Sequence, residues 1–366
     1  MVILGIETSC DETAVGVLEI GKNNNDFWVY PRANVIASQI KIHRFYGGVV
    51  PTLASREHLK NIPWVLREAL QKAFPSLEKK GKAIDLIAAT AGPGLIPALL
   101  VGVNFARALA WSGRKPIVGV DHMEGHLLSF LLPSLKQRVE YNLPMTIFPA
   151  IALLVSGGHT QLVYVKKIGD YKIIGRTRDD AAGECFDKSA RILGLSYPGG
   201  PAIAAEAAKV KSRVLELKNS FRLPRPMINS PDYDFSFSGL KTALLYLTRK
   251  LGEKKVERYR PILALELEEA IADVLVKKTL KAAEEFKVKS IILGGGVSAN
   301  QCLREKFRKR IKEEKKGINF LLPSLEYTGD NAIMIALAAF FHYQKNPRNS
   351  FWSWKKVKAE ANLELG

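Results

Sequence analysis

Residues 2–20, VILGIETSCDETAVGVLEI, decide the fold predicted for this chain. An apolar strand runs into a short polar tip and leaves it through a second apolar strand, which is the pattern of a β-hairpin. The same design returns at residues 150–168, AIALLVSGGHTQLVYVKKI, with Ser, Gly and Thr at its tip. Two hairpins with matching hydroxyl-rich tips suggest a duplication, with one hairpin in each of two domains.

Strands and helices alternate outside the two hairpins. An apolar strand, a Gly-Pro-Gly turn and a helix are expected in sequence before the short strand KPIVGV, and a glycine loop joins a later strand to a basic helix. This alternation predicts an α/β architecture. The segments that carry it are residues 84–113, 115–120, 179–194, 261–287, 288–311 and 328–343.

Length and charge limit the protein class. The 366 residues favour two domains, and 54 Lys and Arg against 36 Asp and Glu leave a net charge of +18. Such an excess favours a polyanionic partner, first nucleic acid and second an anionic membrane, although it could also serve solubility alone.

The sequence favours a cytoplasmic location. We expect no membrane span, since no apolar run reaches about 18 residues, and no leader peptide, since strand patterning begins at once. The three cysteines, Cys10, Cys185 and Cys302, are widely spaced, which fits reduced thiols better than a disulfide framework.

The segment 119–130, GVDHMEGHLLSF, places two of the six histidines four residues apart. On a helix, His122 and His126 would share a face and could bind one metal ion, although such a pair can be incidental. Glu124 would point roughly 200° away from His122, so the zinc-peptidase base is missing. Asp330 is a candidate third ligand, or else an ordinary helix cap. Two histidines and a carboxylate suit either Fe(II) or Zn(II).

Two glycine-rich segments indicate phosphate or nucleotide binding. In LVSGGHT, glycines let backbone N–H groups approach an anion, and in LGGGVSAN they lie between a strand and a helix. Neither segment matches the dinucleotide fingerprint or a P-loop. Each is a weak signal by itself, because glycine clusters also serve packing.

The hairpins and the late glycine loop resemble the actin/Hsp70/sugar-kinase superfamily, whose two related domains close over a nucleotide. The chain also resembles the tRNA adenosine threonylcarbamoyltransferase family from residue 1 to about 343. ETSCDET resembles the bacterial and mitochondrial branch rather than the archaeal one, and the bacterial form is favoured because we expect no transit peptide. The motifs that carry this resemblance are LGIETSCDETAVGV, GGVVPTLASREH, DHMEGHL, LLVSGGHTQLV, DDAAGECFDKSARILGLSYPGGP, DFSFSGLKTA, LGGGVSAN and TGDNAIMIA.

The resemblance implies a duplicated, ribonuclease-H-like fold with a nucleotide cleft between its domains. We expect the first actin-like subdomain at residues 1–117 plus 328–345, the second at 118–327, and a loosely ordered basic tail at 346–366. The insertion at 21–26 and this tail lie outside the family pattern, and no role is assigned to them.

The resemblance also implies the site residues. His122, His126 and Asp330 would hold a divalent metal, with Fe(II) favoured over Zn(II). Ala204 stands where relatives often carry an acidic residue, which puts one ribose contact in doubt. Contacts with the nucleotide-like substrate would come from Leu154, Val155, Ser156, Gly157, Gly158, Asp187, Gly200 and Asn300.

By the same resemblance, the substrates are threonylcarbamoyl-AMP and tRNA, and the product is modified adenosine 37 of ANN-decoding tRNAs. Asp11 and Glu12 are the candidate proton acceptors, although both could be simple turn residues. The implied partners are a smaller paralogous subunit (TsaB-like) and a P-loop ATPase (TsaE-like), without a membrane. The basic segments 249–260 and 304–316 are candidate tRNA contacts or solvated helix faces.

Three alternatives stay open at this point. A nucleotide-driven switch of the actin or Hsp70 kind would explain the hairpins but not the histidines. A metallopeptidase lacks its glutamate, and a non-catalytic nucleic-acid scaffold would explain only the charge.

Overall fold

The computed structural model describes residues 1–23, 26–76, 83–142, 146–210, 221–314, 317–345, 347 and 353–365. The chain divides into two compact units. The first comprises Met1–Thr146, Ile168–Asp170 and Pro323–Gly366, and the second comprises Ile147–Lys167 and Tyr171–Leu322.

The first unit is built on a six-stranded sheet with the order β5-β4-β1-β2-β3-β6. β1 pairs antiparallel with β2 and parallel with β4, so the predicted first hairpin sits at the centre of the sheet. The strands are β1 (Val2–Glu7), β2 (Glu12–Asn23), β3 (Asp26–Ser38), β4 (Leu86–Gly92), β5 (Ile117–Asp121) and β6 (Val139–Asn142).

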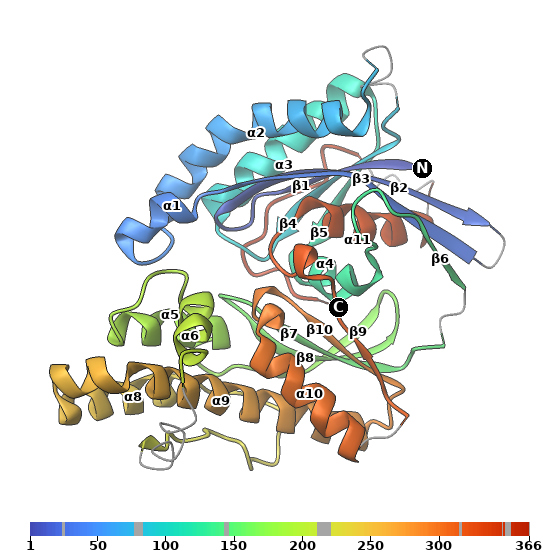
Figure 1. The fold of residues 1–366 in the computed structure, drawn as a ribbon. Helices are drawn as coiled ribbons and strands as arrows, with labels where there is room; N and C mark the ends of the chain where they lie inside the picture. The colour runs from blue at the N-terminus through green and yellow to red at the C-terminus, as the bar shows by residue number, and fades with distance from the viewer. Residues whose placement is uncertain are drawn as a thin grey trace. The chain divides into compact units, whose positions relative to one another are not determined.

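Helices cover both faces of this sheet (Figure 1). α2 (Pro51–Ala73) and α3 (Ile96–Gly113) pack together over one face, while α11 (Ala332–Lys345) and α4 (His122–Leu128) cover the other. Short helical segments complete the unit: α1 (Ile40–His43), η1 (Arg44–Tyr46), η3 (Ser129–Leu131) and η6 (Leu325–Tyr327).

α11 lies unusually close to β1. A Cβ atom added to Gly5 would stand 2.0 Å from the carbonyl oxygen of Ala332, so this close approach requires glycine in the strand. α11 is buried along its first nine residues and fills the core between the sheet and α4. The start of α11 is thereby held against the central strand.

The sheet of the second unit has five strands in the order β11-β10-β7-β8-β9. This order corresponds to β5-β4-β1-β2-β3 in the first sheet, which has β6 as an additional edge strand. β7 and β8 form the second predicted hairpin, and β10 pairs parallel with both β7 and β11. In each unit the first strand pairs with the second and the fourth, which supports the predicted duplication. The strands are β7 (Ala150–Val155), β8 (Thr160–Lys167), β9 (Asp170–Arg176), β10 (Ser290–Gly294) and β11 (Asn319–Leu321).

The helix α9 organises the second unit, because it packs on β7 and β10 and contacts α6, α8 and α10. Its apolar residues form one large buried cluster with those of β7, α5 and α8. The helical segments are α5 (Ala182–Ile192), α6 (Gly199–Ala207), α8 (Ser238–Leu251), α9 (Glu253–Glu285), η5 (Gly296–Ala299) and α10 (Gln301–Glu314).

The division between the units differs from the predicted boundary at residues 117–118. The histidine helix α4 and strand β6 belong to the first unit, because α4 packs on α11 and β6 pairs with β3. These contacts join segments far apart in the chain, so local patterning did not reveal them.

The described part of the tail, residues 353–365, also differs from the loosely ordered segment expected. Glu360 donates its backbone N–H to the carbonyl of Ala91 at 2.7 Å, and Arg107 donates to the carbonyl of Trp354 at 2.9 Å. Val357 is buried in the core of the first unit. Within the insertion at 21–26, residues 24 and 25 lie outside the described residues.

α3 corrects the expectation that no stretch could span a membrane. By length and composition alone, Ile96–Gly113 is apolar enough to do so. Its small and aliphatic residues, among them Ala98, Gly102 and Ala106, are buried against α2 and β4. Buried residues make up 33% of this helix, and Leu100 and Trp111 are exposed, so this packing accounts for only part of its apolar composition.

Candidate functional site

The histidine pair lies on a capped helix that begins where strand β5 ends. The carboxylate of Asp121 accepts hydrogen bonds from the backbone N–H groups of Met123 and Glu124, at 2.7 and 3.2 Å, and so starts α4 at His122. His122 and His126 are buried one turn apart on the same helix face. α4 packs on α11, and this contact brings Asp330, just before α11, to the two rings.

The three side chains converge as predicted. Oδ1 of Asp330 lies 3.1 Å from Nε2 of His126 and 3.4 Å from Nε2 of His122. Donor atoms about 2.0–2.2 Å from one tetrahedral ion lie about 3.3–3.6 Å from each other, so this spacing suits a metal. All three ligand atoms lie within 4.8 Å of one another, so the cluster fits a divalent ion held by two histidines and one carboxylate.

The charges of the cluster reinforce one another. Burial raises the pKa of Asp330, but the charge of His122 and hydrogen bonds from both histidines outweigh it and lower that pKa. Burial lowers the pKa of His122, but the charges of Glu7 and Asp330 raise it well above its usual value. Burial lowers the pKa of His126. Asp330 is thus favoured in the charged form that binds a metal ion, whereas the raised pKa of His122 means that a metal bound there would displace a proton.

Glu7 was missed in the sequence analysis. It ends β1 and is fully buried, with Oε2 at 2.9 Å from Nδ1 of His122. Thr90 donates to the same oxygen at 2.5 Å, and the backbone of Ser9 donates to the other. This arrangement turns Nε2 of His122 toward Asp330 and matches the carboxylate–histidine pairs that support metal ligands. The sequence signal that could have identified Glu7 is its position as a charged residue directly after the wholly apolar run VILGI.

Glu124 points away from the metal cluster, as its helical position predicted. Its Oε2 lies 2.5 Å from Nε2 of His342 on α11. A glutamate held in this pair is not directed at a metal-bound water. The geometry therefore argues against a zinc-peptidase site.

The two candidate bases lie at the tip between β1 and β2. Burial raises the pKa of Glu12 well above its usual value, and the neighbouring charges of Asp11 and Asp330 raise it further. Ser38 donates to Glu12 at 3.0 Å. His58 anchors the tip to α2, with Nδ1 at 2.8 Å from Thr13 Oγ1 and Nε2 at 3.1 Å from the carbonyl oxygen of Cys10.

The glycine loops of the second unit meet at the carboxyl ends of β7 and β10. Gly294 is aligned with Leu154, and Gly295 has a φ of +86° with its Cα against the carbonyl of Val155, where a Cβ would meet that oxygen at 2.4 Å. In open α/β sheets this edge is where ligands bind. At Gly157 and Gly158 a Cβ would meet nothing within 4 Å, so their backbone is accessible.

The remaining predicted contacts differ in what they offer a ligand. Leu154 and Val155 are buried in β7, so their side chains face the core and only their backbone could reach a ligand. Asp187 accepts from the backbone of Gly199 at 2.6 Å, which ties α5 to the start of α6 beside Gly200.

Asn300 caps α10. Its Oδ1 accepts from the backbone of Leu303 at 2.8 Å, and its Nδ2 donates to Glu268 at 2.6 Å. The loop that carries this residue is thus fixed at both ends. Glu268 had no signal in the sequence, because it lies on α9, 32 residues away.

Sequence comparison with known proteins shows the family of this chain. The model of the family described as "TsaD: tRNA N6-adenosine threonylcarbamoyltransferase" matches residues 32–337. Among curated relatives with the name tRNA N6-adenosine threonylcarbamoyltransferase, that of Ralstonia pickettii is 48% identical, over 95% of this chain and 93% of its own. The relative from Thermosipho africanus is 46% identical over 94% of this chain and 95% of its own length. The relative from Bacillus subtilis is 42% identical over 100% of this chain and 96% of its own length.

A solved structure shares the fold at low sequence identity. The HypF protein of T. kodakarensis aligns with a TM-score of 0.55 and 14% identity, over 96% of this chain and 48% of that protein. This likeness concerns the fold alone. The family match covers most of the chain, and several relatives align over nearly their full length. The chain therefore belongs to the tRNA N6-adenosine threonylcarbamoyltransferase family.

Proposed function

We propose that this protein transfers the threonylcarbamoyl group of threonylcarbamoyl-AMP to the N6 amine of adenosine 37 in ANN-decoding tRNAs. The N6 nitrogen attacks the carbamoyl carbon, a C–N bond forms, the bond from that carbon to the phosphate oxygen breaks, and AMP leaves. The observation that carries the proposal is the convergence of His122, His126 and Asp330 in a chain of this family.

His122, His126 and Asp330 are the residues that would hold the metal, with Fe(II) favoured and Zn(II) as the alternative. A bound divalent ion supplies Lewis acidity for the charge that develops on the carbonyl and phosphate oxygens. Glu7 keeps Nε2 of His122 directed at this position through its 2.9 Å contact with Nδ1.

Asp11 or Glu12 accepts the proton that the N6 amine loses. A carboxyl group whose pKa is raised toward neutrality is the stronger base once it ionises, and general bases work best near the operating pH. The pKa of Glu12 is raised by burial and by two neighbouring carboxylates, so Glu12 is the better candidate.

The loops of the second unit would bind the nucleotide part of the substrate. Of the predicted contacts from Leu154 to Gly158, the backbone N–H groups of Gly157 and Gly158 suit a phosphate, as do those near Gly200, because Leu154 pairs within the sheet and Ser156 donates its N–H to the carbonyl of His159. Asp187 and Asn300 would contribute polar side chains. Open space beside Gly157, Gly158 and Gly200 leaves room for an anion to approach the backbone.

The substrate tRNA requires basic surface. On α10 the exposed residues Arg308, Lys309 and Lys312 could contact phosphates, whereas Arg304 is buried and donates to the carbonyl of Ser298. Residues 315–316 of this predicted segment lie outside the described part of the chain.

Protein partners are part of the proposal. α2 and α3 pack against each other, and both expose large apolar side chains, among them Leu59, Trp64 and Leu100. Exposed apolar patches of this kind mark protein interaction sites. They support association with a paralogous TsaB-like subunit, with a TsaE-like P-loop ATPase as a further partner, in the cytoplasm.

The test is transfer from synthetic threonylcarbamoyl-AMP to unmodified ANN-decoding tRNA, with and without the two partner proteins. Nucleoside mass spectrometry measures the modified adenosine, and metal content is determined for wild type and His122→Ala. We expect product from wild type with its partners and its loss in His122→Ala. Absence of product from metal-loaded wild type in every combination would reject the transferase. ATP turnover that does not depend on His122 would then favour a nucleotide switch.

A further inference from the structure

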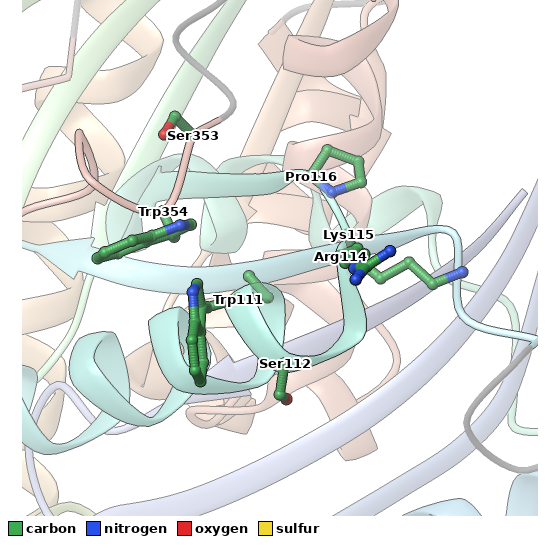
Figure 2. A pocket seen from close by; sticks show the side chains of 8 residues that line it. Trp111, Ser112, Arg114, Lys115, Pro116, Ser353 and Trp354 are labelled. Carbon is green, nitrogen blue, oxygen red and sulfur yellow. The ribbon is translucent and has the colours of Figure 1, made fainter.

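A pocket of about 810 Å³ opens on the first unit, where the end of α3 meets the tail (Figure 2). The indoles of Trp111 and Trp354 line it, one from the helix and one from the tail, together with Arg114 and Lys115. Trp111 is 67% exposed. The proposed reaction uses none of these residues.

The indole of Trp354 is held in place. Arg107 donates to the carbonyl of Trp354 at 2.9 Å, and its guanidinium carbon lies 5.8 Å from the ring centroid. The ammonium of Lys355 lies 5.6 Å from the same centroid. An aromatic surface that is already positioned loses little freedom when a ligand stacks on it.

The pocket lining contains two cations, Arg114 and Lys115, and the segments that run through it and beyond it are rich in Lys and Arg. Residues 107–116 and 353–358 contain Arg107, Arg114, Lys115, Lys355, Lys356 and Lys358, and no Asp or Glu. These 16 residues account for six positive charges in a chain of net charge +18. A pocket of this kind is complementary to a ligand that combines flat rings with phosphates.

This chemistry favours RNA over a protein partner. Stacking on aromatic side chains beside cations that track the backbone is how proteins bind unpaired nucleotides. Protein interfaces are enriched in Trp and Arg but depleted in Lys, so it is the lysine beside the two indoles that favours RNA. The apolar side chains that suit a protein partner lie elsewhere on α2 and α3.

We propose that the Trp111–Trp354 pocket binds unpaired nucleotides of the tRNA substrate, with Arg114 and Lys115 on adjacent phosphates. The inference rests on the proposed function, since it takes tRNA as the substrate. It adds an RNA contact built partly from the tail, which the family pattern leaves without a role.

The test measures tRNA affinity by fluorescence anisotropy over a range of salt concentrations, without turnover. We expect Trp111→Leu and Trp354→Leu each to weaken binding on the order of tenfold, with an unchanged salt slope, because stacking is lost. Arg114→Gln with Lys115→Gln should reduce the slope of log K against log salt by about 1.5. Phe45→Leu, which removes an exposed aromatic ring of η1, is the control and should bind as wild type.

Three results would overturn the proposal. They are wild-type affinity in Trp111→Leu, an equal loss in Phe45→Leu, or weakened binding of the paralogous subunit with intact RNA binding. Trp111 is exposed, so its variant decides the question even if Trp354→Leu releases the tail. The His122→Ala transfer assay reports on the reaction separately, so failure of the transferase assignment remains distinguishable from failure of this site.

Discussion

The carboxylate of Glu7 and the imidazole of His122 form a buried pair across 115 residues of sequence, with 2.9 Å between Oε2 and Nδ1. The central strand of the first sheet thus reaches the helix that carries the two histidines of the proposed metal site. Because Glu7 also accepts from Thr90 and Ser9, its own orientation is fixed. The pair links the fold of β1 directly to the geometry of the metal cluster.

Glu7→Gln is expected to weaken metal binding about 10- to 100-fold, as loss of such supporting carboxylates does in other metal proteins. The amide keeps the size of the side chain but removes the charge that orients His122. Titration calorimetry and metal analysis of purified protein would measure the change. Glu124→Gln is the matched control, because this buried glutamate pairs with His342 and should leave metal affinity near wild type. Equal affinity in wild type and Glu7→Gln would remove Glu7 from the site.

Glu12→Gln should lower the rate of transfer by about 10²- to 10⁴-fold if this carboxylate accepts the proton. Because the pKa of Glu12 is raised by burial and by Asp11 and Asp330, the wild-type rate should climb with pH above the usual range of a glutamate. The apparent pKa obtained from this pH dependence belongs to the interacting carboxylates together. The pH–rate profile of Glu12→Gln should lose this limb.

Glu19→Gln serves as the control for that experiment, since Glu19 lies on the same strand β2 and pairs with Arg32 near the surface. The transfer rate and the pH–rate profile of Glu19→Gln should match those of the wild type. If Glu12→Gln retained the acid limb and Asp11→Asn lost it, the role would pass to Asp11.

Sequence patterns predicted those features that neighbouring residues determine. The two hairpins, the pairing of His122 with His126 and the outward direction of Glu124 follow from periods of two and of 3.6 residues. From the residues alone Asp330 was one candidate third ligand with helix capping as the alternative, and only the family resemblance implied it as a ligand, because its approach depends on the packing of α4 on α11. Glu7 was missed for the same reason, since its partner is distant in sequence.

Local sequence patterns also could not predict where the first unit ends or that residues 353–365 of the tail are ordered. β6 joins the first sheet only through β3, and residues 353–365 gain order from contacts with Ala91 and Arg107. Leu154 and Val155 were assigned to the site from a motif, yet burial leaves only their backbone available.

His58 should make stability depend on pH. Burial lowers the pKa of His58 below 6.5, so the unfolded chain binds a proton more readily than the folded protein. Its contribution to stability is therefore present above pH 6.5 and is lost as the pH falls below that value toward the folded pKa. For one group the slope cannot exceed about 1.4 kcal/mol per pH unit. Urea unfolding from pH 7.5 to 5.5 would measure it, and His58→Gln should flatten this part of the curve. An unchanged slope in the variant would show that other groups govern this pH range.

Gly5→Ala should destabilise the protein and weaken the metal site together. The new Cβ would meet the carbonyl oxygen of Ala332 at 2.0 Å, so the start of α11 must move, at an expected loss of about 1–3 kcal/mol in the free energy of unfolding. Asp330 lies two residues before Ala332, and the same shift should draw its carboxylate from the histidines and reduce metal affinity. Gly239→Ala is the matched control: Gly239 lies in α8 with open space around its Cβ position, where alanine should stabilise by about 0.4–1 kcal/mol. Denaturant unfolding and metal titration of both variants give the two readouts. Normal metal affinity in a destabilised Gly5→Ala would mean that Asp330 is held independently of the contact between β1 and α11.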